Sequence, residues 1–321
     1  MLARAKRIVA TSLLVAATVF PAFAWPDRPV HLIVGFQAGG SSDAIARLLG
    51  EQLRPALGGT AIIVENKPGA AGSIAADAVL GARDGHSLLM FSDTFVTASL
   101  VNRSVRFRPL RDFKMVSVVC EGPLVLLAGP AASFRDFKEF VSYAKANPGK
   151  VNYASSGIGG LQHLTGVYIS TALGLELTHV PTRGGGQAAS DLVGGQIEAA
   201  VLGLGPTLAY IRAGKIRALA VSTASRVRQL PDVPTLMELG VPEFAVAQWF
   251  GLVGPNNMPD AVVDQLSRAV GAALADETIR RRFEEVGFIA QASTPDEFTD
   301  KVRAEEARWK RLVDEHGLKV D

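Results

Sequence analysis

The chain has 321 residues, of which 33 are lysine or arginine and 31 are aspartate or glutamate. Three of the basic residues (Arg4, Lys6 and Arg7) stand at the very start, and without them the balance is 30 basic against 31 acidic groups. A nearly neutral chain lacks the basic surface by which proteins hold nucleic acid, so we expect no nucleic-acid partner. The single cysteine, Cys120, can form no disulfide within the chain.

The first 24 residues predict an exported protein. The basic start is followed by a mostly apolar run from Ile8 to Phe20 and by small residues at Ala22 and Ala24, which are the three parts of a secretory signal peptide. The apolar run is shorter than the roughly 18 to 20 residues that a membrane span needs. We therefore expect cleavage after Ala24, with an uncleaved anchor helix as the alternative.

Short β-rich runs alternate with helical patterns along the rest of the chain. About 297 residues remain after cleavage, which is more than one hydrophobic core usually serves and favours two domains. Strands are expected at residues 30–36, 61–64, 87–91, 124–128, 151–154, 177–180, 197–201 and 216–221. Helices are expected to start at Ser42 or Asp43, between Ser133 and Asp136, at Pro259 and after Thr294. This alternation predicts an α/β fold with mainly parallel sheets that helices cover on both faces.

Three of the predicted strand-to-helix junctions are rich in glycine and small hydroxyl residues. They are GFQAGGSSD (35–43), YASSGIGGLQHL (153–164) and HVPTRGGGQAASD (179–191). Ligands of parallel sheets bind beyond the carboxyl ends of the strands. Glycine lets main-chain amides turn toward a ligand, and the amides of a first helical turn carry partial positive charge. The junctions therefore predict an anion pocket, with plain tight turns as the alternative.

The motifs of nucleotide binding and of catalysis are missing from these loops. Gln162 stands where a G-x-G-x-x-G motif needs glycine, and neither G-x-x-x-x-G-K-[ST] nor G-x-S-x-G occurs in the sequence. The expected anion is therefore a carboxylate, and no cofactor is expected. No two of the five histidines have metal-ligand spacing on one helix, so no metal is expected. Because no arrangement of nucleophile, base and acid can be recognised in the sequence, we do not expect an enzyme.

Four side chains beside the loops have alternative roles. His163 follows a glycine pair, where its ring N–H could point at a ligand oxygen, whereas His179 is expected to be structural. Asp43 is expected to cap a helix and to fix the first loop. Arg183 faces either an anionic ligand or solvent.

Six segments resemble the solute receptors of tripartite tricarboxylate transporters, the Bug-type receptors, and they cover essentially the whole mature chain in order. The segments are PDRPVHLIVGFQAGGSSDAIARLL (26–49), VENKPGAAGSIAADAV (64–79), NPGKVNYASSGIGGLQHL (147–164), HVPTRGGGQAASDLVGGQIEA (179–199), GKIRALAVSTASRVRQLPDVPTLMELGVPEF (214–244) and QWFGLVGPNNMP (248–259). The resemblance implies a two-lobed periplasmic-binding-protein fold (type II, Venus flytrap) with two hinge crossovers, one ending at Ala128 and one at 250–254. Lobe 1 would contain residues 25–123 and 251–321, and lobe 2 residues 124–250.

The resemblance also implies that the first two glycine-rich loops pinch one ligand carboxylate by amides, hydroxyls and water. The residues that match are Phe36, Gly39, Gly40, Ser41 and Asp43 on one lobe and Ser156, Gly157, Gly160 and His163 on the other. We add Thr182 and Arg183 of the third loop. The chain departs from its relatives at three places. The relatives commonly have small hydroxyl residues at positions 160–162, often an aromatic hydroxyl residue in place of Thr182, and frequently an acid or amide near Gly203. We therefore expect a ligand whose distal part is larger or less polar than a small dicarboxylate, such as an aromatic acid.

The implied function is that of a monomeric periplasmic receptor. Its lobes would close over a di- or tricarboxylate or an aromatic acid, and the closed form would dock on the membrane permease subunits of a tripartite tricarboxylate-type transporter. One alternative is a receptor of the same fold that reports to a sensor kinase. A second, from another class, is a secreted enzyme that acts on carboxylates.

Overall fold

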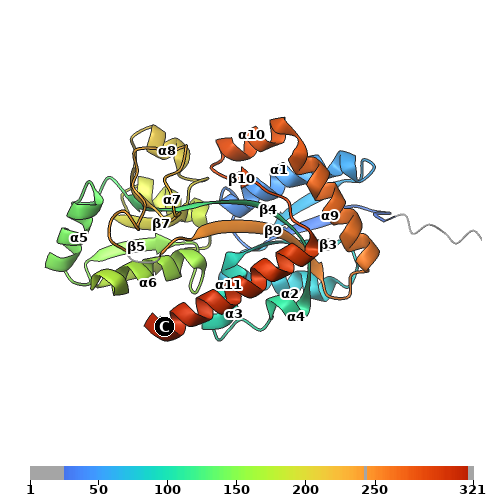
Figure 1. Cartoon of the computed structure of the whole chain (residues 1–321), viewed down its shortest axis with the longest axis horizontal. Coiled ribbons are helices and arrows are strands. Elements are labelled where there is room, and N and C mark those ends of the chain that lie inside the picture. The colour runs from blue at the N-terminus through green and yellow to red at the C-terminus, as the bar shows by residue number, and fades with distance from the viewer. Residues whose placement is uncertain (1–24, 242–243, 317–321) are drawn as a thin grey trace, which may run out of the picture.

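The computed structural model describes residues 25–241 and 244–316. The predicted signal peptide and its cleavage site after Ala24 lie outside the described residues. Two β-sheets lie side by side, each with its own helices (Figure 1). The long strand β4 belongs to both sheets, and β9 pairs with β4 up to the junction of the lobes. The chain therefore forms two lobes that share a hinge of two strands.

The first lobe is built around a sheet of order β2-β1-β3-β9-β4, with β10 added on β4. Its elements are β1 (Val30–Val34), α1 (Ser41–Ala56), β2 (Ile62–Asn66), η1 (Ala70–Gly72), α2 (Ser73–Ala82), β3 (Ser87–Ser92), α3 (Asp93–Val101), α4 (Pro109–Asp112), β4 (Phe113–Ala128), β9 (Ala247–Pro255), α9 (Asp260–Ala275), α10 (Glu277–Glu285), β10 (Ile289–Ala290) and α11 (Pro295–His316). Its buried apolar residues form two clusters, one on each face of this sheet. The sheet is thus the middle layer of the lobe.

The second lobe continues from the far half of β4, in the order β4-β7-β5-β6 with β8 also paired to β4. Its elements are α5 (Phe137–Ala146), β5 (Val151–Ser155), α6 (Leu161–Leu173), β6 (Leu177–Pro181), α7 (Gly185–Val193), β7 (Ala199–Gly203), α8 (Leu208–Arg212) and β8 (Arg217–Val221). Two further apolar clusters cover its faces. All the predicted strands are present, most of them within two residues of the expected limits.

The direction of strand pairing differs from the prediction of mainly parallel sheets. Pairs among β1, β2 and β3 and among β5, β6 and β7 are parallel. Every pairing that involves β4 or β9 is antiparallel. The two hinge strands cross between the lobes in opposite directions, which makes them antiparallel to each other. Local strand–helix alternation reveals only the parallel units, because the partners of a hinge strand are distant in sequence.

Strand β4 is much longer than the predicted strand at 124–128. It begins at Phe113 and passes between the lobes at Glu121, Gly122 and Pro123, which pair with Trp249, Gln248 and Ala247 of β9. These three residues interrupt the apolar pattern, so the sequence predicts an end where the strand continues. A side chain at position 122 would lie 2.7 Å from the carbonyl oxygen of Gly287, which requires glycine there.

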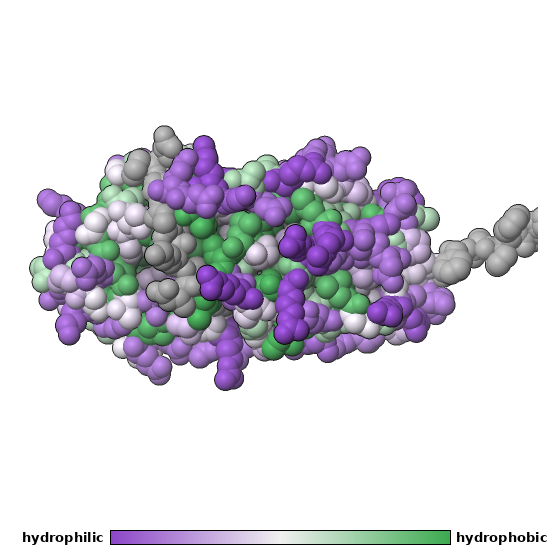
Figure 2. All heavy atoms as spheres, turned by 90° about the horizontal axis from the view of Figure 1, so that it is seen from below, coloured by the Kyte–Doolittle hydropathy of each residue, from purple (hydrophilic) through white to green (hydrophobic). Residues whose placement is uncertain are grey.

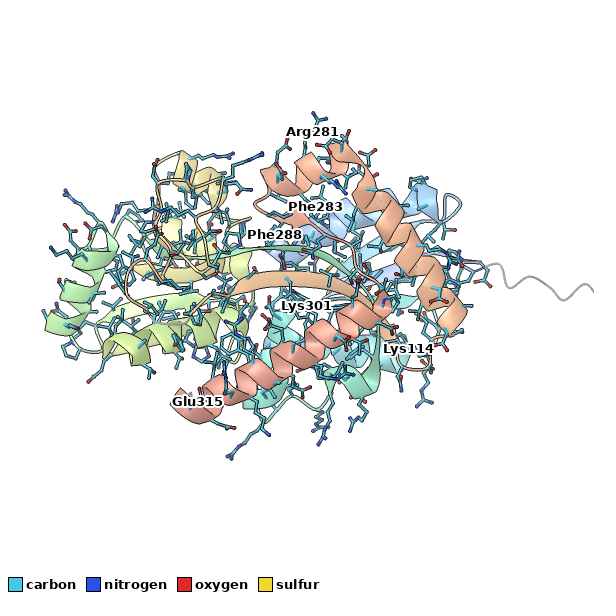
Figure 3. All side chains as sticks on the ribbon, viewed as in Figure 1. Lys114, Arg281, Phe283, Phe288, Lys301 and Glu315 are labelled. Atoms are coloured by element: carbon cyan, nitrogen blue, oxygen red, sulfur yellow. The ribbon has the colours of Figure 1, made fainter. Side chains whose placement is uncertain are left out.

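Helix α11 contacts both lobes. Phe298 and Val302 near its start are buried in a cluster of the first lobe, whereas Trp309 and Leu312 are buried in a cluster of the second. Lys301, next to Val302, lies over the hinge, 3.4 Å from Glu121 and 5.9 Å from the ring centroid of Trp249 (Figure 3). The predicted lobe limits, 25–123 with 251–321 and 124–250, remain a prediction, and α11 bridges them.

Two predicted helix starts are confirmed by their capping bonds. At the start of α11, the side chain of Thr294 accepts from the amide of Glu297 at 3.2 Å, and the side chain of Glu297 accepts from the amide of Thr294 at 2.8 Å. These two bonds are those of a capping box. Asp136 accepts from the amide of Glu139 at 2.8 Å and caps α5. Helix α1 begins earlier than expected, with Gly40 as its N-cap in place of Ser42 or Asp43.

One face of the molecule, seen from below, is mostly polar (Figure 2). On the face seen from below, hydrophilic side chains occupy the rim, and apolar side chains gather toward the middle, where the lobes join (Figure 2). No helix in the described ranges is both long enough and apolar enough to cross a membrane.

Candidate ligand-binding site

The two lobes touch across the cleft, so the structure is in a closed form. The amide of Gln37 in the first lobe donates to the carbonyl oxygen of Arg183 in the second at 3.2 Å. A Cβ atom at Gly186 would lie only 3.0 Å from the carbonyl carbon of Gly39. On the other side of the cleft, a Cβ atom at Gly160 would lie 2.9 Å from Cγ2 of Thr94. Closure therefore depends on glycines where main chain meets the opposite lobe.

Four helices begin at this cleft, two from each lobe. Their N-cap residues are Gly40 for α1, Ser92 for α3, Gly160 for α6 and Gly184 for α7, and none of these caps makes a side-chain hydrogen bond to its helix. The amides of a first helical turn have no partner within the helix. They also carry the positive end of the helix dipole, about half a unit charge. Four such ends facing one another favour an anion.

An inner cavity of about 20 Å³ lies between these helix starts. Its lining is mainly hydroxyl, amide and glycine groups from both lobes: Phe36, Gly40, Ser41, Ser42, Ser92, Thr94, Ser156, Gln162, Gly185 and Gln248. In the closed form it has room for about one water-sized group. The cavity thus has room for a small polar group and excludes the bulk of a larger ligand.

Two buried polar atoms of this lining have no hydrogen-bond partner among the described residues. They are Oγ of Ser92, in a residue 1 % exposed, and Oε1 of Gln248, in a residue 4 % exposed. A buried polar atom left unpaired costs about 1–3 kcal/mol. A Cβ atom at Gly203 would lie 2.4 Å from that Oε1 and 2.9 Å from Oγ of Ser41, so Gly203 makes the room that these groups occupy. Both atoms are available to a ligand.

An outer cavity of about 290 Å³ adjoins the inner one and shares Phe36 and Ser156 with it. The rest of its lining is Gly35, Gly69, Ala70, Ala71, Gly72, Asn102, Ser104, Gly157, Ile158, Pro181, Thr182 and Arg183. Arg183 is the one charged residue of this lining and is exposed. The outer cavity is therefore suited to a less polar body with one cation within reach.

The turn at 69–72, on the first-lobe side of the outer cavity, has an unusual backbone. Gly69, Ala70, Ala71 and Gly72 all have positive φ, with values of 47° and 51° at the two alanines. Alanine is rarely found in this left-handed region, because its Cβ crowds the following carbonyl oxygen. Strain of this kind gathers at ligand-binding segments.

Asp43 fixes the shape of the first loop. Its carboxylate accepts from the amide of Gly39 at 3.1 Å and from Nε of Arg47 at 3.0 Å. Burial by itself raises the pKa of Asp43, but the hydrogen bonds from Arg47, Gly39 and Asn66 outweigh burial, so the pKa lies below its usual value. Gly39 adopts φ of +82°, in the left-handed region that glycine enters without strain. The expected loop-fixing role of Asp43 is what its contacts provide.

In the second loop, too, main-chain amides donate hydrogen bonds to side chains of the protein. Gln162 Oε1 accepts from the amide of Ser156 at 2.9 Å, and Ser155 Oγ accepts from that of Gly157 at 3.3 Å. The amide of Gly159 donates to Nδ1 of His163 at 3.1 Å. The sequence predicts that loop amides such as those of Gly39 and Gly157 face the ligand. Both amides are instead bonded to side chains within their own loops.

The eleven predicted ligand-binding residues divide into two groups. Those that line a cavity are Phe36, Gly40, Ser41, Ser156, Gly157, Thr182 and Arg183. Those that line neither cavity are Gly39, Asp43, Gly160 and His163. His163 lies behind the second loop, where its ring accepts a hydrogen bond from the amide of Gly159 and does not face the cleft.

Several lining residues were missed in the sequence. The turn at 69–72 follows a predicted strand and is glycine-rich, so the same signal that marked the other loops applies to it. Ser92, Thr94 and Gln248 have no local signal, because they reach the cavity only when β3 and β9 pair side by side. Within the described ranges, no group of three or more His, Cys, Asp or Glu side chains could hold a metal ion.

Comparison with known proteins agrees with this architecture. The family model described as tripartite tricarboxylate transporter family receptor matches residues 45–318. A solved structure of the periplasmic binding protein BugD is 34% identical, covers 92% of this chain and 99% of its own, and superposes with a TM-score of 0.88.

Two similar solved structures are described with a bound acid. Rpa4515 of R. palustris, with adipate, is 31% identical over 92% of this chain and 99% of its own, at a TM-score of 0.88. MatC of Rhodopseudomonas palustris, with bound malate, is 32% identical over 90% of this chain and 100% of its own, at 0.86.

Proposed function

Because this chain belongs to the tripartite tricarboxylate transporter family of receptors, which are periplasmic solute-binding proteins, we propose that it captures a small carboxylate between its lobes. The closed receptor then docks, as a monomer, on the membrane permease subunits of a tripartite tricarboxylate-type transporter. One observation carries the proposal, namely the convergence of four uncapped helix starts on one hydroxyl-lined cavity.

A carboxylate suits that cavity for physical reasons. Orphan amides and hydroxyl groups can donate to its two oxygens, and the dipoles of the helices favour its charge without a lysine or arginine. We propose that Ser41, Gly40 and Ser156 surround the carboxylate together with Ser92 and Gln248. The Asp43–Gly39 and His163–Gly159 hydrogen bonds shape the two loops, and Gly160 permits their approach.

The outer cavity sets the class of ligand. Phe36, Ile158 and Pro181 give it apolar walls, and Arg183 supplies one cation at its edge. These walls support a ligand whose distal part is larger or less polar than that of succinate. We propose an aromatic acid or a longer dicarboxylate such as the adipate of Rpa4515, with Gly157 and Thr182 beside its distal part.

Thermal unfolding of the chain from Trp25 onward tests the proposal. Succinate, malate, adipate and benzoate are added one at a time, and isothermal titration measures the affinity of those that stabilise the protein. We expect at least one acid to raise the melting temperature, and adipate or benzoate to exceed succinate. No stabilisation by any acid, or conversion of a bound acid into product, would contradict a receptor function.

A further inference from the structure

Two histidine rings stack face to face directly behind the second binding loop. The ring centroids of His163 on α6 and His179 on β6 are 3.7 Å apart, with 13° between the ring planes. Both rings line a groove of about 540 Å³ on the second lobe, and neither lines the inner or the outer cavity. Any effect of these rings on a ligand therefore passes through the loop.

Each ring supports part of that loop. The amide of Gly159 donates to Nδ1 of His163 at 3.1 Å, so Nδ1 carries no proton and the ring is the Nε2–H tautomer. Nε2 of His179 lies 2.7 Å from Oγ of Ser155. The same Oγ lies 3.1 Å from the carbonyl oxygen of Gly157 and 3.3 Å from its amide nitrogen. With a proton on Nε2, His179 donates to the hydroxyl oxygen and leaves the hydroxyl proton for Gly157, which satisfies all three contacts.

The neutral state of both rings is favoured by their surroundings. Burial lowers the pKa of His163 to about 4, and burial together with the charge of His163 lowers that of His179 to about 3. The other titratable residues lining the groove are Tyr153 and Glu176. Burial raises the pKa of Tyr153, which stays neutral, and Glu176 is exposed. A proton added to His163 must bind Nδ1, which removes the acceptor of the Gly159 amide.

The supported segment of the loop is also the segment that meets the first lobe. A Cβ atom at Gly159 would lie 3.1 Å from Cγ2 of Val101, and one at Gly160 would lie 2.9 Å from Cγ2 of Thr94. Ser156, at the start of the same loop, lines both cavities. A displaced Gly159 therefore disturbs lobe closure and the ligand site together.

We propose that His163 and His179 are positioning residues that hold the second loop in its ligand-ready shape only while both imidazoles are neutral. Acid then favours the open, ligand-free receptor. The proposal rests on the carboxylate-binding function above and adds a regulation of that site. In a loosened loop His163 regains a pKa of about 6.5, so affinity falls by up to about tenfold per pH unit as the pH drops from there toward the pKa of the closed form.

Isothermal titration with adipate and with malate, from about pH 7.5 down to about pH 4.5, tests this regulation across the ordinary pKa of histidine. The informative variant is His163→Asn, whose amide oxygen replaces Nδ1 as acceptor and does not titrate. Below about pH 6 we expect the dissociation constant of the wild type to rise more steeply than that of the variant. The comparison cancels the titration of the acids themselves. His31→Asn, on β1 away from the cleft, is the matched control and should keep the wild-type profile.

The outcomes separate this inference from the proposed function. Equal pH dependence in the wild type and His163→Asn would overturn the inference and leave the receptor function standing. If neither of these acids binds at any pH, and succinate and benzoate do not bind either, this counts against the function, and nitrogen-15 NMR of the ligand-free wild type then decides the inference. We expect the Nε2–H tautomer at His163 and a Gly159 amide signal that shifts with the same midpoint as the ring. A ring that titrates without any response at Gly159 would refute it.

Discussion

The main-chain amide of Gln37 donates a 3.2 Å hydrogen bond to the carbonyl oxygen of Arg183 in the opposite lobe. Main-chain atoms can approach this closely because the neighbouring residues have no side chains. A Cβ atom at Gly184 would lie 3.0 Å from the amide nitrogen of Gln37, and one at Gly186 would lie 3.1 Å from the carbonyl oxygen of Ala38. The glycines of these loops thus permit lobe closure.

A bulky side chain at position 40 should block closure without unfolding either lobe. In Gly40→Leu, the Cβ atom would lie 3.5 Å from the amide nitrogen of Gly186 and the rest of the side chain would reach further into the opposite loop. We expect loss of ligand-induced thermal stabilisation and a larger radius of gyration in X-ray scattering. Gly81→Leu, at an open position on α2, is the matched control. Unchanged stabilisation in Gly40→Leu would place the ligand elsewhere.

Removal of the Asp43 carboxylate should loosen the first loop. Asp43→Ala leaves the Gly39 amide and Arg47 without their acceptor, and we expect a loss of about 1–2 kcal/mol in the free energy of unfolding together with weaker ligand binding. Asp43→Asn keeps an acceptor and should lose less. Because the folded-state pKa is lowered, the stabilisation by the carboxylate is present above its unfolded pKa of 3.8 and is lost as the pH falls through the folded value. Urea unfolding at neutral and acid pH measures both effects.

The opposite pH dependence is expected at Asp93. This residue starts α3 beside the inner cavity, and its carboxyl group accepts from the amide of Trp249 at 2.8 Å. Burial raises its pKa to about 8, so the folded protein holds a proton that the unfolded chain releases above pH 3.8. Stability contributed by this proton therefore falls as the pH rises from 3.8 to about 8, by up to about 1.4 kcal/mol per pH unit.

Asp93→Asn should remove that dependence. The variant has no proton to lose, so its urea midpoint at about pH 8 should exceed that of the wild type, and the two should converge at acid pH. Equal midpoints at all pH values would mean that Asp93 is charged in the folded protein.

The end of α11 should be necessary for the stability of the second lobe. Trp309 is fully buried in a cluster of that lobe, and its Nε1 donates to Glu305 at 3.1 Å. Trp309→Ala should cost about 3–5 kcal/mol in the free energy of unfolding, as truncation of a buried aromatic usually does. Lys310→Ala, at the exposed neighbouring position, should cost little. A small effect of Trp309→Ala would show that the stability of the second lobe does not depend on this end of α11.

The sequence by itself determined the local structure of this protein. The alternation of strand and helix patterns, the glycine-rich junctions and the capping box at Thr294 depend on residues close together in the chain, and the structure has each of them. The prediction of an anion pocket from the three loops used the same local information. This local information indicates that main-chain amides are accessible beyond the ends of the strands. It does not indicate which of these amides remain without a hydrogen-bond partner inside the protein.

Tertiary structure decided the hinge and the content of the site. Strand β4 continues through Glu121, Gly122 and Pro123 because β9, more than a hundred residues later, pairs with it there. The separate pairing of β9 with β3 brings Gln248 and Ser92 to the lining of the inner cavity. His163 lies at the back of its loop, where the ring of His179 from β6 stacks on it. These contacts join distant segments, and their free energy depends on packing and burial, which no local pattern encodes.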